Sequence, residues 1–408
     1  MADYQYIIVG GGVAGASAAA GIREYDQQGT VLLISNEPYL PYHRPPLTKD
    51  LWFGKKTLKQ VFVEPETFFA EQRITLALGV EVTAVDANNH RLTDSGGVEY
   101  QYGKLLLATG GIPRRLDIPG ENLDGVCYYR YLDDYQAIHG QTETGVSAVV
   151  IGGGFIGSEI AAALANSQAI VTMIYPEPTL CSRVFPAEMG NALQEQYRRC
   201  GMTMLKEDMP TAIQRHDGQF VTRTRSGRQI VSDLLLVGVG ITPAIELAQH
   251  AGLAIDNGIV VDTYLRTSHP DIYAAGDNAN FPYTALGQRT RVEHWDNAVN
   301  QGKYAGRNMA GAEMAYDYMP YFFSDLFKLS YEAVGEVHAR LETFADWQQV
   351  NEKGVIYYLR DGKVRGVMMC NIWNQVDAAR ALIQSGRTWS KEQLRGAIGK
   401  PATGQQAA

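Results

Sequence analysis

One stretch, YIIVGGGVAG at residues 6–15, decides the fold. Its first four residues predict a buried strand, its glycines predict a tight turn, and the Ala-rich segment through Ile22 predicts a helix. A second apolar strand over residues 31–34 follows and leads to Glu37. Strand, glycine turn, helix, strand and acid in this order are typical of a dinucleotide-binding βαβ unit.

The same unit occurs again, as AVVIGGGFIG at residues 148–157, with a helix through Leu164 and a strand over residues 171–174 that leads to Glu177. In such a unit the first glycine permits the turn, the second lets a pyrophosphate approach the backbone, and the third lets the helix pack on the strand. The acid accepts hydrogen bonds from ribose hydroxyls. Two such units predict two nucleotides, one a bound cofactor and one an exchanging substrate, and therefore electron transfer.

Three further apolar segments end in glycine turns. They are LLLATGG at residues 105–111, LLLVGVG at residues 234–240 and IYAAGD at residues 272–277. The first two are expected to be buried strands that carry the chain from one domain to the next. The third is expected to present the carboxylate of Asp277 at the end of a strand.

Composition excludes several classes of protein. The 408 residues predict two to three domains, and a net charge of −8 without a block of basic residues argues against nucleic acid as a partner. The four cysteines form no CxxC pair, and the eight histidines show no metal-binding spacing, so no metal site is predicted. No segment has the length and composition of a membrane span, and we expect a cytoplasmic location.

The motifs above, together with RPPLTK at residues 44–49, resemble the two-dinucleotide flavoproteins of the pyridine nucleotide-disulfide oxidoreductase superfamily, in its branch of ferredoxin reductases and apoptosis-inducing factor. The resemblance extends over residues 4 to about 340. It implies an α/β fold with two Rossmann-like dinucleotide-binding domains and a small α+β C-terminal domain. The expected boundaries are 1–115 with 243–319 for the FAD domain, 116–242 for the NAD domain and 320–408 for the C-terminal domain.

The resemblance also implies the residues that bind the cofactors, FAD and NADH. FAD would be held by Gly10, Gly12, Gly15, Glu37, Arg44, Lys49 and Asp277, and NAD by Gly152, Gly154, Gly157, Glu159 and Glu177. Further candidate cofactor-binding residues lie in the glycine turns and at the start of a helix predicted to open at residue 293: Thr109, Gly110, Phe155, Ile156, Gly240, Glu293, His294 and Trp295. That helix could aim its N-terminus at the flavin or be an ordinary capped surface helix.

Lys49 and Glu159 are the predicted catalytic residues. The resemblance places Lys49 near flavin N5, paired with Glu159 on the first turn of the second nucleotide helix, where the pair would orient the nicotinamide. The alternatives are a solvated surface lysine and an acid that only complements the helix dipole. Phe155 is either a gate over the flavin face or an apolar turn residue.

The segment 45–49 contains no cysteine, which argues against reduction of a substrate through a redox-active disulfide or thiol. The leading function is an NADH-dependent FAD oxidoreductase that passes electrons to a ferredoxin-like protein, a quinone or another acceptor. The alternative is a redox-sensing flavoprotein of the apoptosis-inducing factor type, with slow turnover and oligomerisation linked to reduction; a homodimer is compatible with either. A flavin mono-oxygenase is disfavoured because it usually lacks the full second nucleotide domain.

The C-terminal part is expected to form short strands. Residues 355–359 and 363–369 flank Asp361-Gly362, a strong hairpin signal. A helix is predicted from residue 375 to residue 384, and residues 401–408 are expected to be a loose tail.

Overall fold

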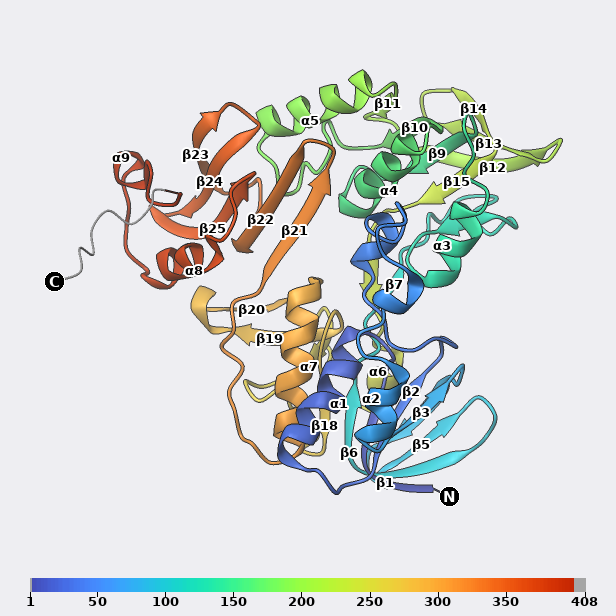
Figure 1. The fold of residues 1–408 in the computed structure, drawn as a ribbon, viewed down its shortest axis with the longest axis vertical. Coiled ribbons are helices and arrows are strands. Elements are labelled where there is room, and N and C mark those ends of the chain that lie inside the picture. Colours follow the sequence, from blue (N-terminus) through green and yellow to red (C-terminus); the bar gives the residue numbers. More distant parts are fainter. Residues whose placement is uncertain (1, 400–408) are drawn as a thin grey trace. The chain divides into compact units, whose positions relative to one another are not determined.

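The computed structural model describes residues 2–399, and the chain divides into two compact units (Figure 1). Unit 1 comprises residues 1–46, 53–112 and 241–320, and unit 2 comprises residues 47–52, 113–240 and 321–408. The predicted α/β class is confirmed, whereas the division into three domains stays a prediction. The predicted tail, residues 401–408, lies outside the described residues.

Unit 1 is built on a mainly parallel sheet. Strand β1 (Ala2–Val9) lies between β2 (Val31–Ser35) and β6 (Glu99–Leu107), while β3 (Ile74–Leu78) extends the sheet beyond β2. On the far side of β6, β5 (Arg91–Asp94) and β4 (Val82–Asp86) pair antiparallel, and β18 (Ile272–Ala274) pairs with β6 in parallel. Because β1, β2, β6 and β18 are parallel, their carboxyl ends meet at one edge, where the glycine turns begin.

Two helices of unit 1 lie side by side, α1 (Val13–Tyr25) and α7 (Trp295–Met309) (Figure 1). Glycines make this approach possible, because a Cβ on Gly302 would lie 2.2 Å from the Ala14 carbonyl oxygen and one on Gly306 would lie 2.0 Å from that of Ala18. The remaining elements of unit 1 are short: α2 (Glu66–Glu71), α6 (Glu246–His250), β16 (Ile241–Pro243), β17 (Ile259–Val260), β19 (Ala279–Tyr283) and β20 (Gln288–Arg291). Three single-turn 3₁₀ helices span Pro45–Thr48, Leu58–Gln60 and Thr284–Leu286, and β7 (Gly111–Pro113) pairs with β16.

Unit 2 repeats the parallel arrangement. Its five-stranded sheet has the order β11-β10-β9-β15-β8, with bounds Thr203–Lys206, Ile170–Tyr175, Ser147–Ile151, Leu234–Val237 and Val126–Tyr128. The helices of this region are α3 (Leu132–His139), α4 (Phe155–Asn166) and α5 (Ala187–Arg199). A separate antiparallel sheet contains β12 (Pro210–His216), β13 (Gln219–Thr224) and β14 (Gln229–Ser232).

The C-terminal part of unit 2 is an antiparallel sheet of order β21-β22-β25-β24-β23. The bounds are Tyr321–Leu326, Leu329–Gly335, Lys363–Cys370, Lys353–Arg360 and Glu342–Gln349, followed by α8 (Val376–Gln384) and α9 (Lys391–Leu394). The predicted hairpin is confirmed, because β24 and β25 pair and the turn residues Asp361 and Gly362 have φ of 52° and 69°.

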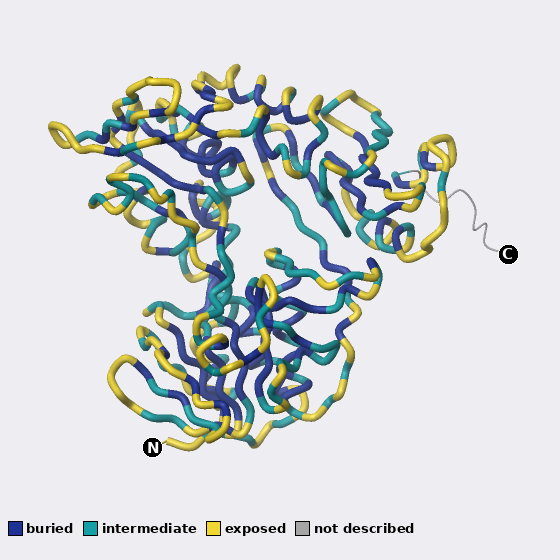
Figure 2. The backbone as a smooth tube through the Cα atoms, turned by 180° about the vertical axis from the view of Figure 1, so that it is seen from behind, coloured by how far each residue is buried: buried dark blue, intermediate teal, exposed yellow. Residues whose placement is uncertain are grey.

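The cores of the two units coincide with their sheets. Figure 2 shows buried backbone along the central strands, and every residue of β2 and β15 is buried. Such continuous apolar burial is typical of parallel strands covered on both faces. Within residues 2–399, no helix has the length and apolar character needed to cross a membrane.

Candidate functional site

The first glycine turn of unit 1 leaves room for a ligand. Gly10 has φ of +126°, and a Cβ there would lie 2.1 Å from the Ala108 carbonyl oxygen, so this position requires glycine. A Cβ on Gly15 would lie 2.0 Å from the Gly10 carbonyl oxygen, which explains the close packing of α1 on the turn. A Cβ on Gly12, by contrast, would meet no atom within 4 Å, and Gly12, as the N-cap residue, has no side chain that could cap α1. Open space beside uncapped helix amides fits a pyrophosphate.

Glu37 follows β2 and is held by two neighbours. Its Oε1 accepts a hydrogen bond from Arg44 Nη2 at 2.9 Å, and its Oε2 accepts one from the Tyr42 hydroxyl at 2.5 Å. Two predicted FAD residues, Glu37 and Arg44, are therefore brought together as an ion pair. A carboxylate offers about four lone-pair sites, so Glu37 retains capacity for a ribose hydroxyl. Tyr42 was not predicted from the sequence.

The carboxyl ends of β6 and β18 bring Thr109, Gly110 and Asp277 to the same edge. Asn278, fully buried beside Asp277, donates from Nδ2 to the Leu107 carbonyl oxygen at 3.1 Å and to the Thr109 hydroxyl at 2.9 Å. The Asn278 Oδ1 atom accepts no hydrogen bond from any of residues 2–399. A buried amide oxygen of this kind can accept a donor from a bound group. Asn278 was not predicted from the sequence.

Glu293, His294 and Trp295 lead into α7, which begins at Trp295. Arg291 Nη1 donates to Glu293 Oε1 at 2.6 Å and to the Asp277 carbonyl oxygen at 2.9 Å, and thereby links this segment to the carboxyl end of β18. The His294 side chain makes no capping hydrogen bond to α7, which disfavours an ordinary capped helix. Desolvation lowers the pKa of His294 to about 4, so its imidazole is neutral at pH 7.

The second glycine turn, in unit 2, repeats this geometry. Gly152 has φ of +119°, and a Cβ on Gly157 would lie 2.1 Å from the Gly152 carbonyl oxygen. Gly154 again has open space around its Cβ position and provides no side-chain cap to α4. Glu177 is half-buried after β10, and Gly240, with φ of +100°, also has no atom within 4 Å of a Cβ.

Lys49 and Glu159 form the pair predicted from the sequence. Lys49 Nζ lies 2.7 Å from Glu159 Oε1, with side-chain exposures of 16% and 15%. The reading of Lys49 as a solvated surface residue is therefore wrong. Glu159 is the fifth residue of α4, so it stands in the second helical turn and not in the first as predicted. Its carboxylate binds the Lys49 ammonium and two hydroxyls, so it does more than complement the helix dipole.

Two hydroxyls complete the surroundings of Glu159. Thr48 Oγ1 donates to Glu159 Oε2 at 2.9 Å, and Ser324 Oγ donates to Oε1 at 2.5 Å. Lys49 Nζ also lies 5.7 Å from the centre of the Phe323 ring. The Thr48 and Ser324 hydroxyls and the Lys49 ammonium all donate to Glu159, and the Phe323 ring contacts the ammonium. These contacts fix the positions of the Glu159 carboxylate and the Lys49 ammonium. Neither hydroxyl was predicted as part of the site.

Phe155 and Ile156 are the first two residues of α4, and both are half-buried. The Phe155 ring centre lies 5.7 Å from that of Phe322 and 6.5 Å from that of Tyr331. Phe155 thus belongs to an aromatic cluster within unit 2. This contact accounts for an apolar side chain at the position, and the role of a gate stays a prediction.

The four cysteines are free thiols. Burial raises the pKa of Cys181 and Cys370 to about 12 and also raises the pKa of Cys127, while Cys200 is exposed. The three less exposed thiols are therefore protonated at neutral pH and are weak nucleophiles.

Comparison with known proteins agrees with this geometry. The family model for pyridine nucleotide-disulphide oxidoreductases matches residues 4–302, and the model for the C-terminal region of the mitochondrion-associated apoptosis-inducing factor matches residues 346–385. The 5,5'-dehydrodivanillate O-demethylase ferredoxin reductase subunit of Sphingobium sp. is 34% identical, over 97% of this chain and 96% of the relative. Apoptosis-inducing factor 1 of Dictyostelium discoideum is 32% identical, over 95% of this chain and 79% of the relative.

Among solved structures, putidaredoxin reductase in its covalent complex with putidaredoxin matches with a TM-score of 0.89 and 28% identity. The match covers 96% of this chain and 95% of the reductase chain. The chain therefore belongs to the pyridine nucleotide-disulphide oxidoreductase family, as its sequence motifs indicated, and is an oxidoreductase with FAD and NADH as its cofactors.

Proposed function

We propose that this protein passes electrons from NADH, through FAD, to a ferredoxin-type electron carrier. The observation that carries the proposal is the occurrence of two glycine turns of one geometry, one in each unit, each beside an uncapped helix N-terminus. The relatives support the acceptor class, since one is a ferredoxin reductase subunit and another is a reductase in complex with putidaredoxin. A quinone or another diffusible acceptor is the alternative within the same chemistry.

The roles of the chain's own residues follow from the geometry. A flavin accepts a hydride and releases its two electrons singly, which links NADH to a one-electron carrier. Gly12 and α1 would bind the FAD pyrophosphate, and Glu37 would hold a ribose of FAD. Gly154 and α4 would bind the NAD pyrophosphate. Glu159 holds the Lys49 ammonium in one position, and Lys49 would orient the nicotinamide and lie near flavin N5.

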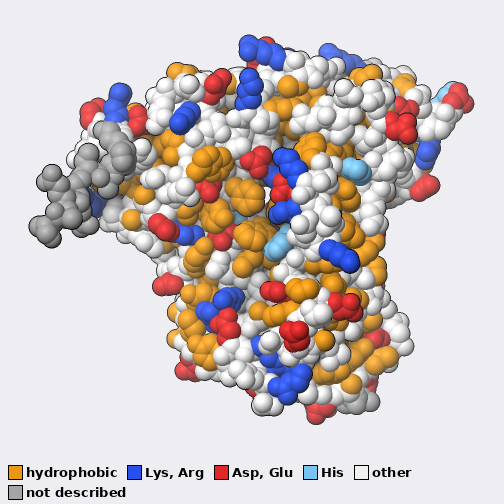
Figure 3. Space-filling model, viewed as in Figure 1, with side chains coloured by type: hydrophobic (Ala, Val, Ile, Leu, Met, Phe, Trp, Pro, Cys, Tyr) orange, Lys and Arg blue, Asp and Glu red, His pale blue; other side chains and the backbone are white. Residues whose placement is uncertain are grey.

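The surface offers one candidate place for an acidic carrier. Lys55, Lys56 and Lys59 are all exposed in unit 1, and positive side chains attract the acidic surfaces that ferredoxins usually present. Across the face shown in Figure 3, Lys and Arg side chains lie among Asp and Glu side chains instead of forming one extended patch. A carrier would therefore dock through local charge complementarity. A cytoplasmic location is part of this proposal.

The acceptor is tested by reducing the FAD-loaded protein with NADH in the absence of oxygen and then adding oxygen, a soluble quinone or a [2Fe–2S] ferredoxin separately. We expect ferredoxin to reoxidise the flavin faster than either other acceptor. Reoxidation by the quinone alone would show that the acceptor is a quinone and not a ferredoxin-type carrier.

A second function, redox sensing, is favoured by the match of residues 346–385 to the apoptosis-inducing factor family. It predicts slow reoxidation by all three acceptors and a change in oligomeric state on reduction. Light scattering on the oxidised and NADH-reduced protein measures that change. A size that is the same in both states, together with rapid turnover, would exclude the sensor.

NADH should be preferred to NADPH. Glu177 would accept hydrogen bonds from the ribose hydroxyls and repel a 2′-phosphate. Arg183 is a nearby cation that could attract a 2′-phosphate, and its side chain is exposed. We expect a preference of about tenfold or more in nucleotide affinity, equivalent to about 1.4 kcal/mol. Glu177→Ala should reduce this preference, while Glu207→Ala, which removes a more exposed carboxylate, should leave it unchanged. Equal rates of flavin reduction by the two nucleotides would refute the role of Glu177.

A further inference from the structure

A cluster of metal-ligating side chains lies in unit 1, away from the glycine turns. His90, His269 and Asp271 each offer a ligand atom, and these three atoms lie within 4.8 Å of one another. His90 belongs to the connection between β4 and β5, whereas His269 and Asp271 precede β18. All three side chains are half-buried, so an ion from solvent can reach them. Nothing in the proposed electron-transfer function uses these residues.

The distances within the cluster suit a small divalent ion. His90 Nε2 lies 3.4 Å from Asp271 Oδ2, and the His90 and His269 ring centres are 5.6 Å apart at an interplanar angle of 76°. Two ligand atoms at about 2.0–2.1 Å from a tetrahedral zinc are separated by roughly 3.4 Å. The His90–Asp271 pair thus already has the separation of two ligands on one ion.

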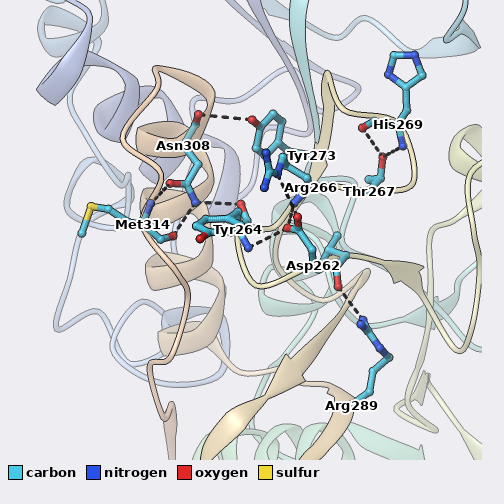
Figure 4. A network of polar contacts seen from close by, with 10 residues as sticks. Asp262, Tyr264, Arg266, Thr267, His269, Tyr273, Arg289, Asn308 and Met314 are labelled. Carbon is cyan, nitrogen blue, oxygen red and sulfur yellow. Dashed lines mark hydrogen bonds and ion pairs between the residues drawn. The ribbon is translucent and has the colours of Figure 1, made fainter.

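The backbone around the cluster is well fixed. The Thr267 hydroxyl donates to the His269 carbonyl oxygen at 3.2 Å and accepts from the His269 amide at 3.1 Å, and Asp262 holds the loop that precedes them (Figure 4). In the same view the His269 imidazole extends away from the Asn308–Tyr264 contacts. The Leu105 amide donates to the Asp271 carbonyl oxygen at 2.9 Å and ties Asp271 to β6. A backbone fixed in this way limits the conformational freedom that is lost when an ion binds.

Tyr102 provides a second, independent observation. Its ring stacks on His90, with centres 5.2 Å apart and an interplanar angle of 4°, and its side chain is 2% exposed. The buried Tyr102 hydroxyl has no hydrogen-bond partner among residues 2–399. Desolvation raises the pKa of this hydroxyl, and the charges of Asp86 and Asp271 add to the shift. A buried hydroxyl left without a partner is costly, and water carried by a nearby ion is one group that could satisfy it.

We propose that His90, His269 and Asp271 bind a divalent transition-metal ion, with Zn²⁺ as the best fit, through one nitrogen of each imidazole and one carboxylate oxygen. Two imidazoles favour Zn²⁺ over Mg²⁺ or Ca²⁺, which prefer oxygen ligands. Three protein ligands leave a fourth position for water. In the absence of the ion, the His269 Nδ1 atom accepts a hydrogen bond from the Asp271 amide at 3.3 Å, a weak contact that coordination can replace.

Lys104 competes with the ion. Its ammonium pairs with Asp271 Oδ1, on the same carboxylate that would bind zinc. The metal must therefore bind against a positive charge, which weakens its affinity. Removing that charge should strengthen zinc binding, a result that an ordinary surface ion pair does not predict.

The metal site would stabilise the folded protein and would take no part in electron transfer. Asp271 lies before β18, at the strand end opposite to the glycine turn that follows Ala274. The bound ion would join the β4–β5 connection to the segment before β18. Zinc should therefore raise the thermal stability of the protein, because a ligand that binds only the folded state stabilises it. It should not change the rate of flavin reduction by NADH.

The test uses the untagged, full-length, FAD-loaded protein after treatment with a chelator. Calorimetric titration with ZnCl₂ should show one ion per chain, and MgCl₂ should show no binding. His90→Gln and His269→Gln should each weaken zinc binding at least about tenfold, whereas Lys104→Gln should strengthen it. His216→Gln is the matched control, because His216 contacts a single carboxylate, Asp217, at 3.0 Å on the surface. It should bind zinc as the parent does.

Flavin content and the rate of NADH reduction, measured on each variant, establish that it is folded and separate this site from electron transfer. Absence of zinc binding in the parent, or full binding in both His90→Gln and His269→Gln, would overturn the proposal. Weaker zinc binding in Lys104→Gln would also contradict it. A failure of the ferredoxin assay, in contrast, would leave the zinc site unaffected.

Discussion

Replacing Gly12 with valine is expected to give a folded protein that purifies without colour, whereas the parent carries one FAD per chain. Gly12 has φ of −85° and ψ of −173°, an extended conformation that valine adopts readily. A Cβ there meets no protein atom within 4 Å, so the fold tolerates the side chain. The branched methyl groups would occupy the space proposed for the pyrophosphate. The flavin absorbance per chain, read against circular dichroism, measures the result.

Gly154→Val is the matched variant in unit 2. Gly154 has nearly the same backbone angles, −83° and −167°, and the same open space. This variant should keep its flavin and lose reduction by NADH. Gly10 and Gly15 cannot serve the same purpose, because a Cβ at either would collide with the backbone and disturb the fold. A Gly12→Val protein with stoichiometric flavin would place FAD in the other unit.

The structural elements that depend on a short local sequence pattern could be predicted from the sequence. The strand, turn and helix around Gly10 and Gly152 follow from apolar runs interrupted by glycines at fixed spacing, and the structure contains both. The hairpin at Asp361-Gly362 was predictable for the same reason, since the turn needs two residues with positive φ. Each of these features is encoded within about fifteen residues.

Most contacts between distant segments were not predicted, and the exception, the pair of Lys49 and Glu159, came from the family resemblance. Ser324 reaches Glu159 from β21, and Asn278 reaches Thr109 from the loop after β18, yet neither residue stands in a pattern that marks a ligand. The cluster of His90, His269 and Asp271 was missed because metal motifs are recognised by short spacing, and these residues meet only when β18 pairs with β6. Glu159 was expected in the first turn of its helix, whereas it is the fifth residue of α4, which begins at Phe155 immediately after the glycine turn.

The second large effect is expected for the pair Lys49 and Glu159. Glu159→Ala leaves an ammonium with 16% exposure and removes the carboxylate to which the Thr48 and Ser324 hydroxyls donate. Breaking such a largely buried pair costs about 2 to 4 kcal/mol. If the whole cost falls on the transition state, stopped-flow reduction by NADH slows roughly 30- to 1000-fold. Flavin content should stay near that of the parent, because neither residue is proposed to hold the FAD phosphates.

Coupling between the two residues distinguishes a catalytic pair from two separate contributions. If Glu159 acts by positioning Lys49, the double variant should reduce little more slowly than the slower single variant. Ser324→Ala is the matched control, because it removes one hydrogen bond to Glu159 and leaves the charge pair intact, so its rate should fall only about tenfold or less. Additive effects of Lys49→Ala and Glu159→Ala would mean that the residues act apart. A Glu159→Ala protein reduced as fast as the parent would mean that the carboxylate serves only the packing of α4 against β21.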